Sequence, residues 1–67
     1  MAERLLDIDE VARRLSVVRL TVLRHLDKLK AKGLQQVRFG KRSIRFREAS
    51  LDRLIKNAAE REESLFD

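Results

Sequence analysis

The apolar residues of this chain repeat with two different periods, and the period changes at Gln36. Before that residue they recur every three or four positions, which is typical of helices that bury one face. From Val37 to Phe46 they alternate with arginines, as in β-strands, around a Gly-Lys-Arg-Ser stretch that predicts a turn. Helical spacing returns from Leu51 to Ala58. The pattern predicts a mainly α-helical fold of three helices, with a two-stranded hairpin before the last one.

The first helix has clear boundary signals, and we expect it from Ile8 to Leu15. Asp7 and Glu10 have the spacing of a capping box, in which each side chain accepts a hydrogen bond from the other residue's backbone N–H. Residues 16–18 then interrupt the apolar pattern, which predicts a tight turn into a second helix.

The second helix is expected to be continuous from Arg19 to Lys32, with Gly33 as its C-cap. Val18, its expected N-cap, has no side-chain acceptor for a backbone N–H, so we expect the helix start to be weaker by ~1 kcal/mol or shifted by one residue. The single histidine, His25, lies close to the apolar stripe of this helix. A half-buried side chain is therefore expected there rather than a catalytic one.

The alternation in the hairpin predicts its register. Four apolar side chains are expected on one face, in two facing pairs: Phe39 with Ile44 and Val37 with Phe46. The same register places Arg38 opposite Arg45 on the outer face. Two like charges directly opposed are unfavourable unless an anion lies between them, so we expect this pair to bind a phosphate.

The charge of the chain is unevenly distributed. The 67 residues carry a net charge of +5, but residues 1–12 and 57–67 each sum to −3 and residues 13–56 sum to +11. A basic block of this size indicates a polyanionic partner, most simply nucleic acid. Eleven arginines against five lysines favour bidentate contacts to phosphate or guanine. A basic surface that serves only solubility is the alternative interpretation.

Composition argues against several other classes of protein. One histidine and no cysteine, tyrosine or tryptophan leave few groups for catalysis, and a chain of this size has little room for a water-excluding site. The same composition excludes disulfides and does not supply a transition-metal ligand set, so we expect no cofactor. No apolar run has the length of a transmembrane helix or signal peptide. We expect a non-enzymatic cytoplasmic protein, associated with the nucleoid.

Three segments of the sequence indicate a more specific class of protein. The chain reads LLDIDEVA at residues 5–12, LSVVRLTV at 15–22, and VRFGKRSIRF followed by REASL at 37–51. In this order they resemble the excisionase-like branch of the MerR-type winged helix-turn-helix family, over about residues 5–58. That family usually has Gly where Ser16 stands, and Ser or Thr where Val18 stands. Residues 28–34 lengthen the second helix, and residues 21–34 are similar to the recognition helix of larger winged-helix repressors.

The resemblance implies a small winged helix-turn-helix domain over residues 1–58. The acidic residues that follow predict a frayed tail over residues 59–67. Five residues of the second helix are expected at DNA: Arg19, Leu20, Thr21, Arg24 and Lys28. Five residues of the wing are expected there as well: Arg38, Lys41, Arg42, Ser43 and Arg45. We expect Arg24 to bind guanine in the major groove and Leu20 to contact a thymine methyl group, with Thr21 and Lys28 at phosphates. A protein contact for Leu20 and a solvated surface for the others are the alternatives.

The function implied by the resemblance is that of a recombination directionality factor. Such a protein binds repeated sites side by side on double-stranded DNA, bends the duplex and helps an integrase, without catalysis. A small phage, plasmid or prophage transcriptional regulator is the alternative. Two further hypotheses are a protein-interaction adaptor of the antitoxin or partition type, and a protein that binds structured RNA. We expect no membrane and no small-molecule ligand, and other copies of the chain or an integrase as possible protein partners.

Overall fold

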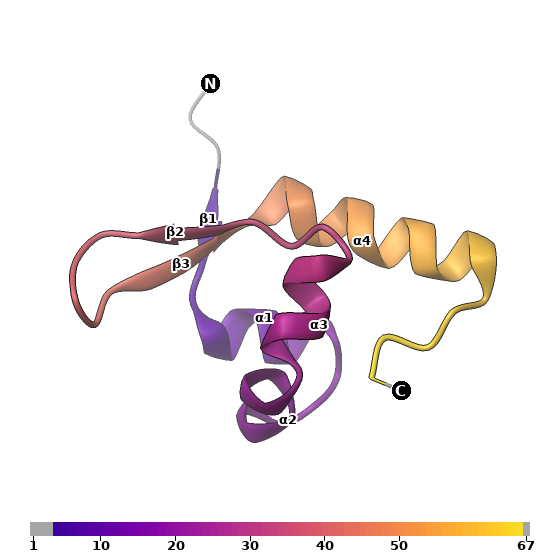
Figure 1. Ribbon diagram of the computed structural model, residues 1–67, viewed down its shortest axis with the longest axis horizontal. Coiled ribbons are helices and arrows are strands. Elements are labelled where there is room, and N and C mark those ends of the chain that lie inside the picture. Colours follow the sequence, from indigo (N-terminus) through magenta and orange to yellow (C-terminus); the bar gives the residue numbers. More distant parts are fainter. Residues whose placement is uncertain (1–3, 67) are drawn as a thin grey trace.

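The computed structural model describes residues 4–66, so the expected domain limits at residues 1 and 67 lie outside the described range. In this range the elements are β1 (Leu5–Leu6), α1 (Ile8–Arg14), α2 (Arg19–Arg24), α3 (Leu26–Ala31), β2 (Gln36–Arg38), β3 (Ile44–Arg47) and α4 (Glu48–Arg61). About half of the chain is helical, and the three strands form one antiparallel sheet. In Figure 1 the β2–β3 hairpin projects to one side of the helices and α4 extends to the other. No helix of the described part is long and apolar enough to cross a membrane.

Helix α1 begins where the capping box predicts. The Asp7 carboxylate accepts from the backbone N–H of Glu10 at 2.8 Å, and the Glu10 carboxylate accepts from that of Asp7 at 3.5 Å. The helix ends at Arg14, one residue before the expected limit. Ser16 then adopts a left-handed backbone with a φ of 57°, and the N–H groups of Ser16 and Val17 donate to carbonyls in the last turn of α1. The predicted tight turn is therefore confirmed.

The prediction of one continuous helix from Arg19 to Lys32 is wrong, because His25 interrupts it with φ −112° and ψ 16°. Nδ1 of His25 donates to the carbonyl of Thr21 at 2.9 Å, and the backbone N–H of His25 donates to the same carbonyl. Side chain and backbone thus share one acceptor, which disturbs the helical hydrogen-bond ladder at this point. Helix α3 starts afresh at Leu26. His25 is half-buried, as expected.

This helical segment starts at Arg19, as expected, and ends at Ala31, one residue before the expected limit at Lys32. Val18 is the N-cap of α2 and makes no side-chain capping hydrogen bond. At the other end Gly33 has a φ of 123°, a conformation that favours glycine. The N–H of Gly33 donates to the carbonyl of Lys30, and the N–H of Leu34 donates to that of Leu29. These two bonds form a Schellman motif, which satisfies carbonyls that the end of α3 would otherwise leave free.

Strand β3 is central in the sheet, between β1 and β2. Leu6 of β1 lies opposite Phe46 of β3, and both side chains are fully buried. Strand β1 has no periodic signal in the sequence because it is only two residues long. The sheet therefore has one strand more than the predicted hairpin.

The predicted register of the hairpin is wrong by one residue. The observed pairs are Gln36 with Phe46, Val37 with Arg45, and Arg38 with Ile44. The N–H of Phe39 donates to the carbonyl of Ser43 at 2.8 Å, which shortens the turn by one residue relative to the prediction. Val37 and Phe39 consequently fall on the face opposite Phe46, and Phe39 is 63% exposed rather than part of the core. The two arginines expected to face each other lie on opposite faces.

One apolar core joins the helices to the sheet. Its buried side chains are Leu6, Val11, Ala12, Val22, Leu29, Leu34, Phe46, Leu51 and Leu54. Helix α4 follows β3 directly, and the Ser50 hydroxyl secures this junction. It donates to the carbonyl of Arg47 at 2.7 Å and accepts from the N–H of Gln35 at 3.0 Å.

Of the acidic tail expected over residues 59–67, residues 59–61 belong to α4, and the described residues after Glu62 lie against the helices. Glu62 has a left-handed backbone with a φ of 52°, and the chain after it turns back beneath α4 (Figure 1). Nζ of Lys32 lies 3.4 Å from the Glu63 carboxylate. The ring of Phe66 packs edge-on to that of His25, with 5.2 Å between centroids. The tail therefore covers the junction between α2 and α3.

Candidate nucleic-acid interface

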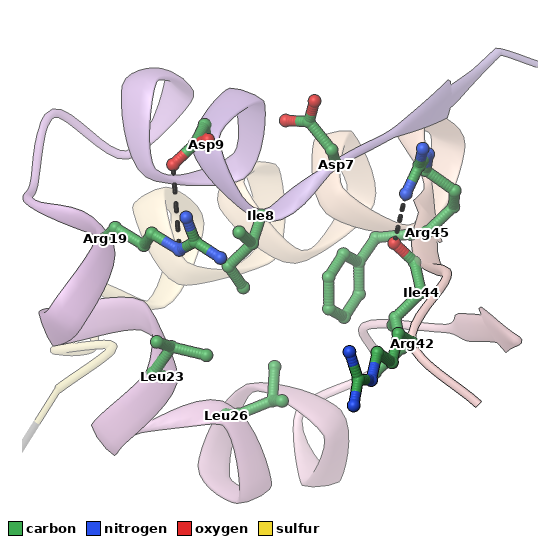
Figure 2. A pocket seen from close by; sticks show the side chains of 10 residues that line it. Asp7, Ile8, Asp9, Arg19, Leu23, Leu26, Arg42, Ile44 and Arg45 are labelled. Carbon is green, nitrogen blue, oxygen red and sulfur yellow. Dashed lines mark hydrogen bonds and ion pairs between the residues drawn. The ribbon is translucent and has the colours of Figure 1, made fainter.

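A pocket of about 270 Å³ lies between the start of α1, helices α2 and α3, and the β2–β3 hairpin. Its lining residues are Asp7, Ile8, Asp9, Arg19, Leu23, Leu26, Arg42, Ile44, Arg45 and Phe46. We call it the helix–hairpin pocket. Figure 2 shows Leu23 and Leu26 directed toward it from the helices, while Arg42 approaches from the hairpin. Half of the lining is apolar, and the other half consists of three arginines and two aspartates.

The residues predicted for DNA contact on the second helix fall on α2 and the start of α3. They are Arg19, Leu20, Thr21, Arg24 and Lys28. Nε of Arg19 lies 3.8 Å from the Asp9 carboxylate, so part of its charge is neutralised within the protein. Thr21 is half-buried, whereas the other four side chains are exposed. Leu20 in particular is 53% exposed, so its side chain is accessible to a binding partner.

The predicted wing residues lie on the hairpin. Four of them are exposed, at the end of β2 or in the turn: Arg38, Lys41, Arg42 and Ser43. The fifth, Arg45, is half-buried in β3, and its Nη1 donates to the carbonyl of Ile44 at 2.9 Å. The argument that Arg45 needs a phosphate to offset a facing arginine does not hold, because Val37 lies opposite it.

Only part of the predicted site converges in space. Arg19 from α2 and Arg42 and Arg45 from the hairpin line the helix–hairpin pocket together. The remaining seven residues do not line it: Leu20, Thr21, Arg24, Lys28, Arg38, Lys41 and Ser43. The structure thus brings the helix and the hairpin together at this pocket, with the other predicted contacts on the outer surfaces of both elements.

The cations of this surface are mostly unpaired. Within residues 4–66, five predicted contact residues have a charged side chain without a hydrogen bond or ion pair: Arg24, Lys28, Arg38, Lys41 and Arg42. By contrast, Arg14 of α1 forms ion pairs with Glu48 and Asp52 of α4. Four cations elsewhere are also unpaired in the described range, so basicity is not confined to the candidate interface: Arg13, Lys30, Arg53 and Lys56. An unpaired surface cation retains its full charge for an external anion.

The exposure of three apolar side chains on this surface was not predicted from the sequence. Val18 is 68% exposed, Phe39 63% and Leu23 49%. The sequence does contain a signal for the exposure of Leu23, because this residue follows Val22 directly and lies off the apolar stripe of the helix. Phe39 had no such signal, because its exposure depends on the register of the hairpin.

Comparison of the chain with protein-family models, curated proteins and solved structures found no match. Among residues 4–66, no group of three or more histidine, aspartate or glutamate side chains is placed to hold a metal ion. We define the candidate interface by its exposed cations, its exposed apolar side chains and the helix–hairpin pocket.

Proposed function

We propose that this protein binds duplex DNA as a small winged helix-turn-helix domain. Helices α1 and α2, joined by the turn at residues 15–18, would be the helix-turn-helix, and the β2–β3 hairpin would be the wing. The observation that carries the proposal is the set of unpaired cations on α2, α3 and the hairpin, on both sides of the helix–hairpin pocket. A duplex presents phosphates on both sides of a groove, so cations on two neighbouring projections match it.

The exposed side chains of α2 and α3 suit the major groove, which is wide enough for a helix. We assign Arg24 to a bidentate guanine contact and Leu20 to a thymine methyl group. Lys28, farther along at the start of α3, is assigned to a phosphate. Arg19 contributes less than these residues because Asp9 competes for its guanidinium.

The biological role we propose is that of an excisionase-like recombination directionality factor in the cytoplasm, which binds and bends DNA without catalysis. The resemblance of residues 5–58 to that family supports this role, as does a composition with one histidine and no cysteine, tyrosine or tryptophan. A transcriptional regulator is the alternative role on the same DNA surface. Several direct repeats in the bound sites would favour an excisionase-like assembly, and a single inverted repeat would favour a dimeric regulator.

One observation favours a second candidate function, that of a protein-interaction adaptor. Leu20 and Leu23 of α2, and Val18 at its N-cap, expose apolar surface, and such surface is also typical of protein contacts. The adaptor function predicts that Leu20→Ser and Leu23→Ser abolish binding of a protein partner and leave DNA affinity unchanged. The DNA proposal predicts that Leu20→Ser lowers DNA affinity.

Selection from a random duplex pool followed by footprinting tests the proposal. The variant Arg24→Gln/Lys28→Gln is expected to lower affinity for the selected sites by about 10-fold or more. Its matched control is Arg53→Gln/Lys56→Gln, which removes the same charges from exposed positions on α4. We expect the control to retain most of the affinity. Equal losses in both variants, or a pool without enriched sequences, would contradict a sequence-specific interface on α2 and α3.

A further inference from the structure

Phe39 occupies an unusual position for an aromatic residue in so small a protein. It follows the end of β2, at the turn of the hairpin, and is 63% exposed. Its backbone N–H donates to the carbonyl of Ser43 at 2.8 Å, so the turn that carries the ring is closed by a hydrogen bond. In Figure 1 this turn is the part of the hairpin that projects farthest from the helices. The ring is therefore presented at the end of a protruding ribbon.

The surroundings of Phe39 are cationic. Arg38 precedes it in the chain, and Lys41 and Arg42 follow in the same turn. All three side chains are exposed and unpaired in the part of the chain that the structure describes. An apolar protein surface would have to desolvate these charges to receive the ring. A polyanion with flat apolar faces inside it, such as stacked base pairs between phosphate chains, accommodates both the ring and the charges.

We propose that Phe39 is a wedge that enters the minor groove and inserts its ring between two base pairs, with Arg38, Lys41 and Arg42 at the flanking phosphates. This inference rests on the proposed DNA-binding function and specifies how the hairpin engages the duplex. Apolar wedges of this kind partly unstack one base step and kink the duplex by roughly 20–90° toward the major groove. The kink would turn the duplex toward α2 and allow helix and hairpin to contact one continuous site.

The experiment uses a duplex of about 30 base pairs, or about three helical turns, recovered from the selection above. Donor and acceptor dyes at its two ends report bending, and 2-aminopurine placed at successive adenines reports unstacking. We expect the intact protein to shorten the end-to-end distance and to raise 2-aminopurine fluorescence at one step. Phe39→Ala should lose both signals, and Phe39→Leu should retain part of each, because leucine also acts as a wedge.

A mismatch provides an independent readout. A mismatched pair at the unstacked step lowers the cost of opening it, so the intact protein should bind that duplex several-fold more tightly than the matched one. Phe39→Ala should bind both duplexes equally. Arg38→Gln is the control: it should weaken binding to both duplexes by the same factor and keep the preference for the mismatch. The thermal unfolding midpoint of Phe39→Ala should equal that of the parent protein, because the ring is exposed.

Each contrary outcome has a separate meaning. Persistent bending and 2-aminopurine signal in Phe39→Ala would overturn the wedge and leave DNA binding in place. No binding of the intact protein to any duplex would overturn both proposals. Phe39-dependent binding to a single strand of the same sequence in preference to the duplex would assign the ring to unpaired bases. Phe39-dependent binding to vesicles of phosphatidylserine and phosphatidylcholine, without duplex binding, would assign the hairpin to an anionic lipid surface.

Discussion

Arg38 and Arg45 lie on opposite faces of the β2–β3 hairpin. Arg38 is opposite Ile44 and Arg45 is opposite Val37, and neighbouring residues of a strand point to opposite faces. Arg38 is exposed and unpaired within residues 4–66, whereas Arg45 lines the helix–hairpin pocket and donates to the carbonyl of Ile44. On the proposed DNA-binding function, the two guanidinium groups would contact separate parts of the duplex.

Separate contacts predict additive effects on DNA binding. We expect Arg38→Ala and Arg45→Ala each to lower affinity, and the double variant to match the sum of the two losses within about 0.5 kcal/mol. Fluorescence anisotropy on one duplex measures all three affinities. A coupling well above that value would show that both arginines share one phosphate, as the predicted register had implied.

The left-handed backbone of Ser16 predicts a stabilising substitution. A non-glycine residue in this conformation costs about 1–2 kcal/mol, and the greater chain entropy of glycine in the unfolded state cancels part of the gain. Ser16→Gly should therefore raise the free energy of unfolding by about 0.5–1 kcal/mol, and Glu62→Gly, at the end of α4, by a similar amount. Urea unfolding measures both. Ser16→Ala is the control and should give no gain; a gain as large as that of glycine would exclude backbone strain as the cause.

The uncapped start of α2 predicts a second stabilising change. Val18 is the N-cap and is 68% exposed, so its replacement removes little buried surface. Val18→Ser supplies an acceptor for a free N–H in the first turn and should raise the free energy of unfolding by about 1 kcal/mol. Val18→Ala supplies none and should stay within about 0.5 kcal/mol of the parent. Equal gains in both variants would mean that capping is not the cause.

The packing of the tail on His25 can be tested by comparing two variants, each of which replaces one phenylalanine by alanine. Phe66 is half-buried against His25, so Phe66→Ala should lower the free energy of unfolding by about 1–2 kcal/mol. Phe39→Ala removes the same ring from an exposed position and should leave the stability within about 0.5 kcal/mol. Chemical unfolding compares the two variants directly. No loss in Phe66→Ala would mean that the tail does not contribute to the folded state in solution.

The sequence predicted those features of the fold that depend only on a few neighbouring residues. The Asp7–Glu10 capping box and the glycine at residue 33 each define a helix end by short-range hydrogen bonds; α1 starts where it was expected, and α3 ends at Ala31, within one residue of the expected limit. Ser16 and Glu62 also lie at helix ends and have a left-handed backbone. A serine or glutamate in the sequence does not indicate that conformation, whereas a glycine does. The break at His25 was missed for a related reason. The His25 side chain bonds to a backbone carbonyl without changing the spacing of the apolar residues, so the periodic pattern gives no sign of the break.

Features that depend on distant contacts were not predictable from periodicity. Alternation shows that residues 37–46 form two strands, but the register depends on which turn closes between Phe39 and Ser43. A shift of one residue exchanges the two faces, and this moved Phe39 from the core to the surface. The charged residues of the candidate site were predicted from charge, helical geometry and the family resemblance together. The pocket that joins α2 to the hairpin required the fold.

Binding of the intact protein to duplex DNA across a salt series tests the central claim most directly. Contacts to about four to eight phosphates predict a slope of roughly −4 to −7 for log affinity against log salt concentration. Selected sites should bind about 10³-fold more tightly than random duplex. A steep slope with that selectivity is the expected result. Absence of duplex binding at low salt would contradict the proposed function.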